Sequence, residues 1–116
     1  MTMLIIIDQA PYGSWAGREA LDMAFARAAF DQPVSLLFTG AGINWLRKHQ
    51  DAAAIGQKSV EKNLAAAPIF GVEAIYADQG SCERYYLTAD DLIDGVSLAD
   101  TNADLLARFS ETVFAG

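Results

Sequence analysis

The feature that most constrains the fold is a continuous apolar run, Leu4-Ile5-Ile6-Ile7, followed by a segment rich in turn formers at residues 8–14. A strand that is apolar at every position has no polar face to present to water. Such a run is typical of a central strand in a parallel sheet that helices cover on both faces. The run therefore predicts an α/β fold. We interpret it as a buried strand and not as a signal peptide, because no basic leader precedes it.

The rest of the chain alternates between strand and helix patterns. Apolar residues at spacings of three and four predict a helix over 17–30. The helix is expected to end before Pro33, because proline has no amide N–H for helix propagation. The predicted strands are 4–7, 34–38, 72–77, 95–99 and 111–115, and the predicted helices are 17–30, 43–48, 57–67, 81–86 and 103–109, with a loop excursion at 49–56. This alternation indicates right-handed crossovers. We predict one domain over residues 1–116, with a three-layer, doubly wound α/β/α fold around a mainly parallel sheet of about five strands.

The charge and cysteine content exclude several classes of function. Eight Lys and Arg against 15 Asp and Glu give a formal charge of −7, which opposes nucleic-acid binding. A single cysteine excludes an intrachain disulfide and favours a reducing, cytoplasmic setting. One Cys and one His do not supply the four ligands of a structural zinc site, and no run reaches the roughly 18 apolar residues of a membrane span. We expect no resident metal or cofactor and no direct contact with nucleic acid or membrane.

Ligands of open parallel sheets bind beyond the carboxyl ends of the strands. In this chain that edge is predicted to carry four loops, at residues 8–17, 39–42, 78–82 and 100–102. Gly13 and Gly17 in the first loop precede a helix, but the spacings of the phosphate-binding and dinucleotide-binding glycine loops are absent. A turn that needs positive φ explains these glycines as well. We therefore expect no bound nucleotide.

Cys82 is the one candidate catalytic residue. If Ser81 caps the helix 81–86, Cys82 lies in its first turn, where the partial positive charge lowers a thiol pKa. Arg84 would lower this pKa further, whereas Asp78 and Glu83 would raise it. The other interpretation is an inert, partly buried thiol that packs as a small apolar side chain. Residue chemistry alone favours the inert thiol.

Other polar residues give weaker signals. His49 lies in a charged stretch, which is typical of a solvated loop histidine and not of a general base. Asp90, Asp91 and Asp94 lack the glycine and glutamate of a calcium loop, so we interpret them as a solvated acidic face.

Four aromatic residues lie on or near predicted loops: Trp15, Trp45, Tyr85 and Tyr86. Exposed aromatic side chains are frequent anchors of protein interfaces, although some of these four belong to the core under the alternative interpretation. The pattern predicts an acidic subunit that docks through aromatic patches.

Several segments resemble the DsrF/TusC branch of the DsrE-like sulfur-relay family. The resemblance is carried by residues 3–7, 10–13, 16–22, 33–38, 57–64 and 70–73. Its most specific element is Ala-Gly-Arg-Glu-Ala-Leu-Asp at 16–22, after the Pro-x-Gly turn at 11–13.

The resemblance implies a doubly wound fold and a non-catalytic or sulfur-carrying subunit. Members of this family assemble three homologous small subunits as a dimer of heterotrimers. The expected companions are DsrE/TusD-like and DsrH/TusB-like subunits. A TusA-like carrier would donate a persulfide and a TusE/DsrC-like protein would receive it, for tRNA 2-thiouridine synthesis or for sulfur oxidation.

The chain departs from this family at the third predicted strand. The family commonly places a Cys just after that strand, where this chain has Asp78, and Cys82 follows one helical turn later. The family segment Ser-Leu-x-x-Arg-Gly-Leu corresponds to residues 81–87, without its glycine. In this branch the main sulfur-accepting Cys lies on the DsrE/TusD-like partner. Three hypotheses remain: an accessory relay subunit, a sulfurtransferase that uses Cys82, and a self-associating domain that binds a small molecule at the loop edge.

Overall fold

The computed structural model describes residues 2–8, 16–47 and 71–115. Its elements in chain order are β1 (Met3–Ile7), α1 (Ala16–Ala29), β2 (Val34–Phe38), the 3₁₀ helix η1 (Gly40–Leu46), β3 (Ala74–Asp78), α3 (Gln79–Arg84), the 3₁₀ helix η3 (Ala89–Asp91), β4 (Val96–Ala99), α4 (Ala103–Leu106) and β5 (Glu111–Ala115). The predicted helix 57–67 and the excursion 49–56 lie outside the described residues.

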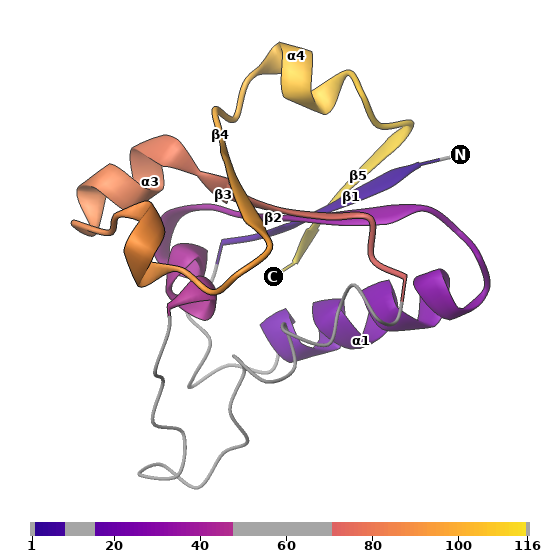
Figure 1. The fold of residues 1–116 in the computed structure, drawn as a ribbon. Coiled ribbons are helices and arrows are strands. Elements are labelled where there is room, and N and C mark those ends of the chain that lie inside the picture. The colour runs from indigo at the N-terminus through magenta and orange to yellow at the C-terminus, as the bar shows by residue number, and fades with distance from the viewer. Residues whose placement is uncertain (1, 9–15, 48–70, 116) are drawn as a thin grey trace, which may run out of the picture.

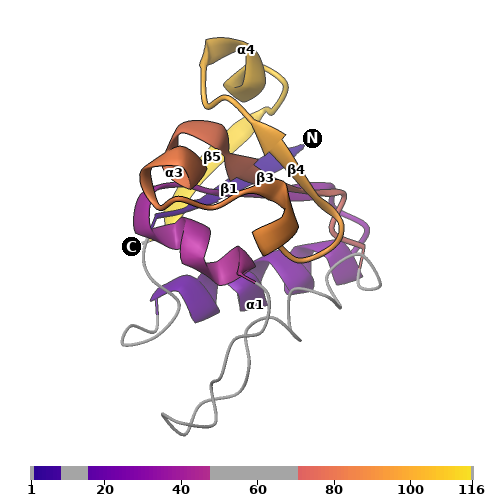
Figure 2. The same cartoon turned by 60° about the vertical axis from the view of Figure 1, so that its left-hand side comes forward.

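The five strands form one parallel sheet in the order β4-β3-β2-β1-β5. Helix α1 lies against one face of this sheet and α4 lies over the other (Figure 1). The turned view in Figure 2 separates the same three layers. The predicted three-layer α/β fold with about five parallel strands is therefore confirmed.

The core lies on both faces of the central strands, because β1 and β2 are buried at every position. Alternate residues of β1 serve the two faces. Ile5 packs in the larger cluster, on the α1 side, whereas Leu4 and Ile6 pack in a smaller cluster with Leu105 of α4. The uninterrupted apolar run of β1 is thus explained by burial from both sides, as parallel sheets require.

The chain leaves β3 and β4 toward opposite faces of the sheet. After β3 it enters α3 and then η3, and Cys82, Leu87 and Leu92 from this segment join the α1-side cluster. After β4 it enters α4, whose Leu105 joins the other cluster. Neighbouring strands with such divergent connections form the switch point at which open α/β sheets bind ligands.

Several helix bounds differ from their predictions. The helix predicted at 43–48 is the 3₁₀ helix η1, which begins at Gly40, directly after the turn residue Thr39, and ends at Leu46, while α1 is shifted by one residue from the predicted 17–30. The segment after β3 begins its helix at Gln79, two residues before the predicted start, because the Asp78 side chain caps it in place of Ser81. Helix α4 is capped by Asn102, whose side chain accepts a hydrogen bond from Leu105 N. It ends at Leu106, earlier than the predicted residue 109.

The turn after β2 presses closely on the end of β1. Thr39 N donates to Ile7 O at 3.1 Å, and Gly42 lies so near that a Cβ at this position would be 2.0 Å from Ile7 O. Only glycine fits such an approach. This contact fixes the carboxyl ends of β1 and β2 next to each other.

Candidate functional site

Asp78 is the centre of a hydrogen-bond network at the carboxyl edge of the sheet. It is the last residue of β3 and the N-cap of α3. Its Oδ2 accepts from Ser81 N at 3.0 Å and from Ser81 Oγ at 2.6 Å. Its Oδ1 accepts from Thr101 N at 3.3 Å and from Thr101 Oγ1 at 2.8 Å. The carboxylate thereby joins the loop after β3 to the loop after β4.

The Ser81 hydroxyl extends this network to the loop after β2. While its proton is donated to Asp78, its oxygen accepts from Gly40 N at 2.8 Å. Gly40 adopts φ of +53°, a conformation that glycine permits. The structure thus brings together three of the four loops predicted at this edge. Most of the fourth, residues 9–15, lies outside the described residues.

Burial and the hydrogen-bond network act in opposite directions on the pKa of Asp78. Partial burial of the carboxyl raises its pKa, but the hydrogen bonds from Ser81 and Thr101 outweigh this effect, so the pKa lies below its usual value. Each carboxylate oxygen accepts two hydrogen bonds, which is about the full acceptor capacity of the group. Asp78 is therefore an ionised structural link, without a spare lone pair directed at a ligand.

Cys82 lies one helical turn after Asp78, with only 3% of its surface exposed, in the α1-side cluster. Burial raises the pKa of its thiol, and the charges of Asp78 and Glu83 raise it further. This direction is opposite to the lowered pKa that the helix N-terminus interpretation of Cys82 implied. The largest cause is burial of Cys82 within the apolar α1-side cluster. Asp78 is the N-cap of α3, which makes Cys82 the fourth residue of this helix.

Of the four aromatic residues predicted as interface anchors, the three that the structure describes differ in how far they are exposed. Trp45 is fully buried beside Phe38, with ring centroids 6.2 Å apart, so the expectation that it lies at an exposed interface is wrong. Tyr85 is half-buried against the α1-side cluster, and Tyr86 is 92% exposed. Trp15 lies outside the described residues, as does His49.

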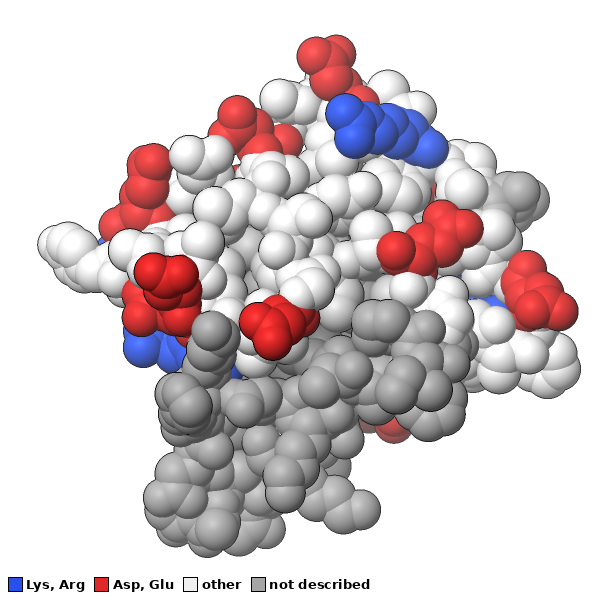
Figure 3. Space-filling model, in the orientation of Figure 1, with Lys and Arg blue, Asp and Glu red and all other residues white. Residues whose placement is uncertain are grey.

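The acidic residues predicted as a solvated face are indeed exposed. Asp90, Asp91 and Asp94 all lie at the surface, and the Asp91 carboxylate accepts from Thr88 N and Thr88 Oγ1. Acidic side chains outnumber basic ones over the face shown in Figure 3. Among the residues that the structure describes, no group of three or more His, Cys, Asp or Glu is arranged to hold a metal ion.

Sequence reasoning found the loops of this edge but missed the contacts of Gly40 and Thr101. Their signal was their position directly after predicted strands. In the described part of the chain, no helix combines the length and apolarity needed to cross a bilayer.

Comparisons with known proteins agree with this architecture. The DsrE/DsrF-like family matches residues 1–111. The TusC homolog of Pseudomonas aeruginosa is 38% identical over 97% of this chain and 96% of its own length. The intracellular sulfur oxidation protein DsrF of Allochromatium vinosum is 38% identical over 74% of this chain and 63% of its own length.

Two solved structures share the fold at low sequence identity. The ychN protein of E. coli superimposes with a TM-score of 0.80 at 17% identity, covering 98% of this chain and 99% of its own. A protein of unknown function from Methanobacterium thermoautotrophicum gives a TM-score of 0.73 at 13% identity, covering 97% of both chains. With a family match over almost the whole chain and relatives of this similarity, the chain belongs to the DsrE/DsrF-like family.

Proposed function

We propose that this chain is a TusC/DsrF-like accessory subunit of a heteromeric sulfur-relay complex, in tRNA thiolation or in sulfur oxidation. The observation that carries the proposal is the 38% identity to a TusC homolog over nearly the full length of both proteins. The similarity to DsrF, named for intracellular sulfur oxidation, supports the same class of role.

The geometry of the carboxyl edge supports an accessory role over a sulfur-carrying one. Sulfur relay requires an acceptor thiolate that attacks the terminal sulfur of a donor persulfide. The new S–S bond forms as the old one breaks, and the donor leaves as a thiolate with no net oxidation. At the edge of this sheet Asp78 offers a fully hydrogen-bonded carboxylate, which cannot form a persulfide. Cys82 is buried and its raised pKa disfavours the thiolate.

The proposal assigns the relay chemistry to partner chains. The companions would be DsrE/TusD-like and DsrH/TusB-like subunits, with a TusA-like donor and a TusE/DsrC-like recipient as transient partners. The complex would work in the cytoplasm, where the reducing poise keeps relay thiols from forming stable disulfides. This chain would then complete the assembly without carrying the sulfur itself.

Co-expression with the two companion subunits encoded by the same genome tests the proposal. We expect a stable complex that contains all three chains, measured by size-exclusion chromatography with light scattering and by native mass spectrometry. A chain that stays alone in the presence of both companions would overturn the proposal. So would an isolated chain that turns over a substrate by itself.

The same complex decides the alternative in which Cys82 carries sulfur. The complex with Cys82→Ala is loaded with persulfide from the TusA-like donor, and the mass of each chain is measured. Under the accessory role, sulfur reaches the recipient as fast as in the wild type, and this chain gains no 32 Da adduct in either complex. Loss of transfer in the variant, with assembly intact, would make Cys82 a relay residue.

A further inference from the structure

Helices α1 and α3 end in the same backbone motif. At the end of α3, Tyr86 N donates to Glu83 O at 3.2 Å and Leu87 N donates to Cys82 O at 2.8 Å. At the end of α1, the corresponding donors are Asp31 N, to Ala28 O at 3.0 Å, and Gln32 N, to Arg27 O at 3.0 Å. These paired bonds define a Schellman motif, whose turning residue adopts a left-handed conformation. That residue is Asp31 in one helix and Tyr86 in the other, with φ of 59° and 58°.

The two turning residues differ in how well they tolerate this conformation. Glycine is the usual residue at the position, and Asp and Asn adopt it more readily than other side chains because their short polar groups bond locally. Tyrosine has no such compensation, so its Cβ is crowded by the backbone. Among the described non-glycine residues, Asp31 and Tyr86 are the two with positive φ. The strain at Tyr86 is therefore a specific cost to the fold.

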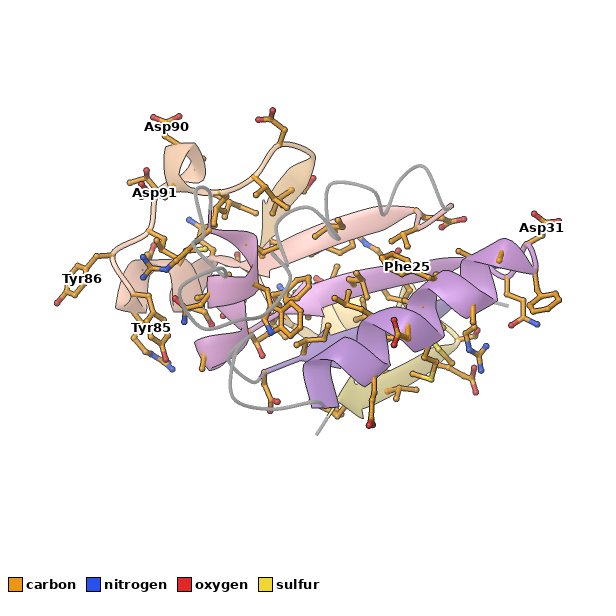
Figure 4. All side chains as sticks on the ribbon, turned by 90° about the horizontal axis from the view of Figure 1, so that it is seen from below. Phe25, Asp31, Tyr85, Tyr86, Asp90 and Asp91 are labelled. Carbon is orange, nitrogen blue, oxygen red and sulfur yellow. The ribbon has the colours of Figure 1, made fainter. Side chains whose placement is uncertain are left out.

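Packing of the Tyr86 ring does not offset this strain, because the ring is almost fully exposed. Five large apolar side chains are exposed in the described part of the chain: Met23, Phe30, Tyr86, Leu98 and Phe114. Tyr86 is the most exposed of them at 92%, and it is the one with a left-handed backbone. Figure 4 shows its side chain projecting away from the body of the molecule. Backbone strain of this kind is concentrated at functional sites of proteins.

The charges around Tyr86 define the surface that would fit it. From Glu83 to Asp94 the chain has four acidic residues and one basic residue, Arg84, and all five are exposed. Asp90 and Asp91 lie at the same end of the molecule as Tyr86, opposite the end that holds Asp31 (Figure 4). A negatively charged rim repels the phosphates of nucleic acid and favours a partner with Lys or Arg at the matching positions.

We propose that Tyr86 is the anchor of a protein–protein contact, and that its ring enters an apolar socket bordered by basic side chains on the partner. Aromatic anchors of this kind dominate interface energetics because a large ring is desolvated with few rotamers to restrict. The proposal rests on the proposed function, since it takes its partner from the other proteins of the relay. It goes further by naming the residue that binds and the chemistry of the surface that receives it.

Titrations of wild-type and variant chains against each companion subunit and each sulfur carrier, by calorimetry, test the anchor. Tyr86→Gly relieves the strain, so we expect its Tm to rise by about 4 °C. We also expect it to weaken binding to one of the four proteins by about 10-fold or more. Tyr86→Phe keeps the ring and should bind within about twofold of the wild type. Asp31→Gly makes the same backbone change at the opposite end of the molecule and should leave all four affinities unchanged.

The binding surface of the partner is identified by crosslinking. A photo-crosslinking phenylalanine analogue replaces Tyr86 in this chain, and the chain is mixed with the protein whose binding Tyr86→Gly weakens. The crosslink should fall on an apolar residue that has Lys or Arg beside it. If the wild type binds its partners and Tyr86→Gly binds them equally well, the anchor is wrong while the proposed function stands. If the wild type binds none of the four proteins, the proposed function falls and the anchor falls with it.

Discussion

Thr101 Oγ1 donates a 2.8 Å hydrogen bond to Asp78 Oδ1, across the carboxyl ends of the neighbouring strands β4 and β3. The chain diverges to opposite faces of the sheet just beyond these two residues, which is where such folds open a crevice for ligands. Here a charged side chain spans the divergence and binds both loops. Asp78 therefore acts as a structural link between the loops that follow β3 and β4.

The first prediction concerns the pH dependence of stability through Asp78. Its pKa in the folded chain is lowered, so the ionised carboxylate stabilises the fold fully above the unfolded pKa of about 3.9. This contribution is lost as the pH falls through that value to the folded pKa. The Asp78→Asn variant lacks the ionised carboxylate at every pH. We therefore expect it to be less stable than the wild type at pH 7, by about 1 kcal/mol. The difference should shrink between pH 5 and pH 3, measured by urea unfolding.

Thr101→Val is the matched control for this prediction. It removes one hydroxyl donor from Asp78 Oδ1 but leaves the carboxylate and the bonds from Ser81. We expect a smaller loss at pH 7 with the same trend toward acid. A difference between wild type and Asp78→Asn that stays constant down to pH 3 would show that the charge of Asp78 does not stabilise the fold.

The second prediction concerns the reactivity of Cys82. Because burial and the charges of Asp78 and Glu83 raise its pKa, iodoacetamide should alkylate the folded chain slowly, with an apparent pKa above the ordinary value of about 8.5. In denaturant the same thiol should titrate near 8.5. Glu83→Gln removes an exposed charge without opening the core, so it should lower the folded pKa and quicken alkylation. Rapid alkylation of the native chain at pH 7 would contradict this description of the thiol.

The strands were predictable from sequence because their signal is local. The five predicted strands lie within two residues of the observed bounds of β1 to β5. The contact between Asp78 and Thr101 was not predictable, since it joins residues 23 positions apart and depends on β4 lying next to β3. A sequence pattern does not contain the strand order.

Local competition and packing explain the remaining errors. Asp78 and Ser81 are both good helix caps, and which of them caps α3 was decided by the end of β3. That choice made Cys82 the fourth residue of α3. The pKa of its thiol is raised by burial and by the charges of Asp78 and Glu83, as the inert-thiol interpretation allows. Trp45 was expected to be an exposed anchor because it lies near a predicted loop, but η1 packs its ring next to Phe38 in the core.

The third prediction concerns the close approach of η1 to β1. A Cβ on Gly42 would lie 2.0 Å from Ile7 O and 2.8 Å from Ile7 C, and both of these atoms are backbone that cannot rotate aside. Gly42→Ala should therefore cost about 3 kcal/mol or more, measured by urea unfolding. Gly80→Ala is the control, because the nearest atom to its added Cβ is Asp78 Oδ2 at 3.7 Å. In helix α3 that change should be neutral or stabilise by about 0.5 kcal/mol. Equal stability of the two variants would contradict the observed contact.

The fourth prediction concerns the face of the sheet that α4 covers, opposite α1. The described part of the chain covers this face with α4, a helix of four residues whose Leu105 packs on Leu4, Ile6 and Leu37. Leu105→Ala removes that contact and should cost about 2–4 kcal/mol. The lost packing affects mainly the segment between β4 and β5 that contains α4. Amide hydrogen exchange should therefore become faster first in α4 and β5, while α1 on the opposite face stays protected.

The control for this prediction is Leu98→Ala on the edge strand β4, where 44% of the leucine is already exposed. It makes the same chemical change with less apolar surface to lose, so we expect a cost below about 1 kcal/mol. If Leu105→Ala cost no more than Leu98→Ala, α4 would not be what seals this face. If hydrogen exchange became faster to the same extent on both faces, the apolar clusters on the two faces of the sheet would unfold together as one cooperative unit.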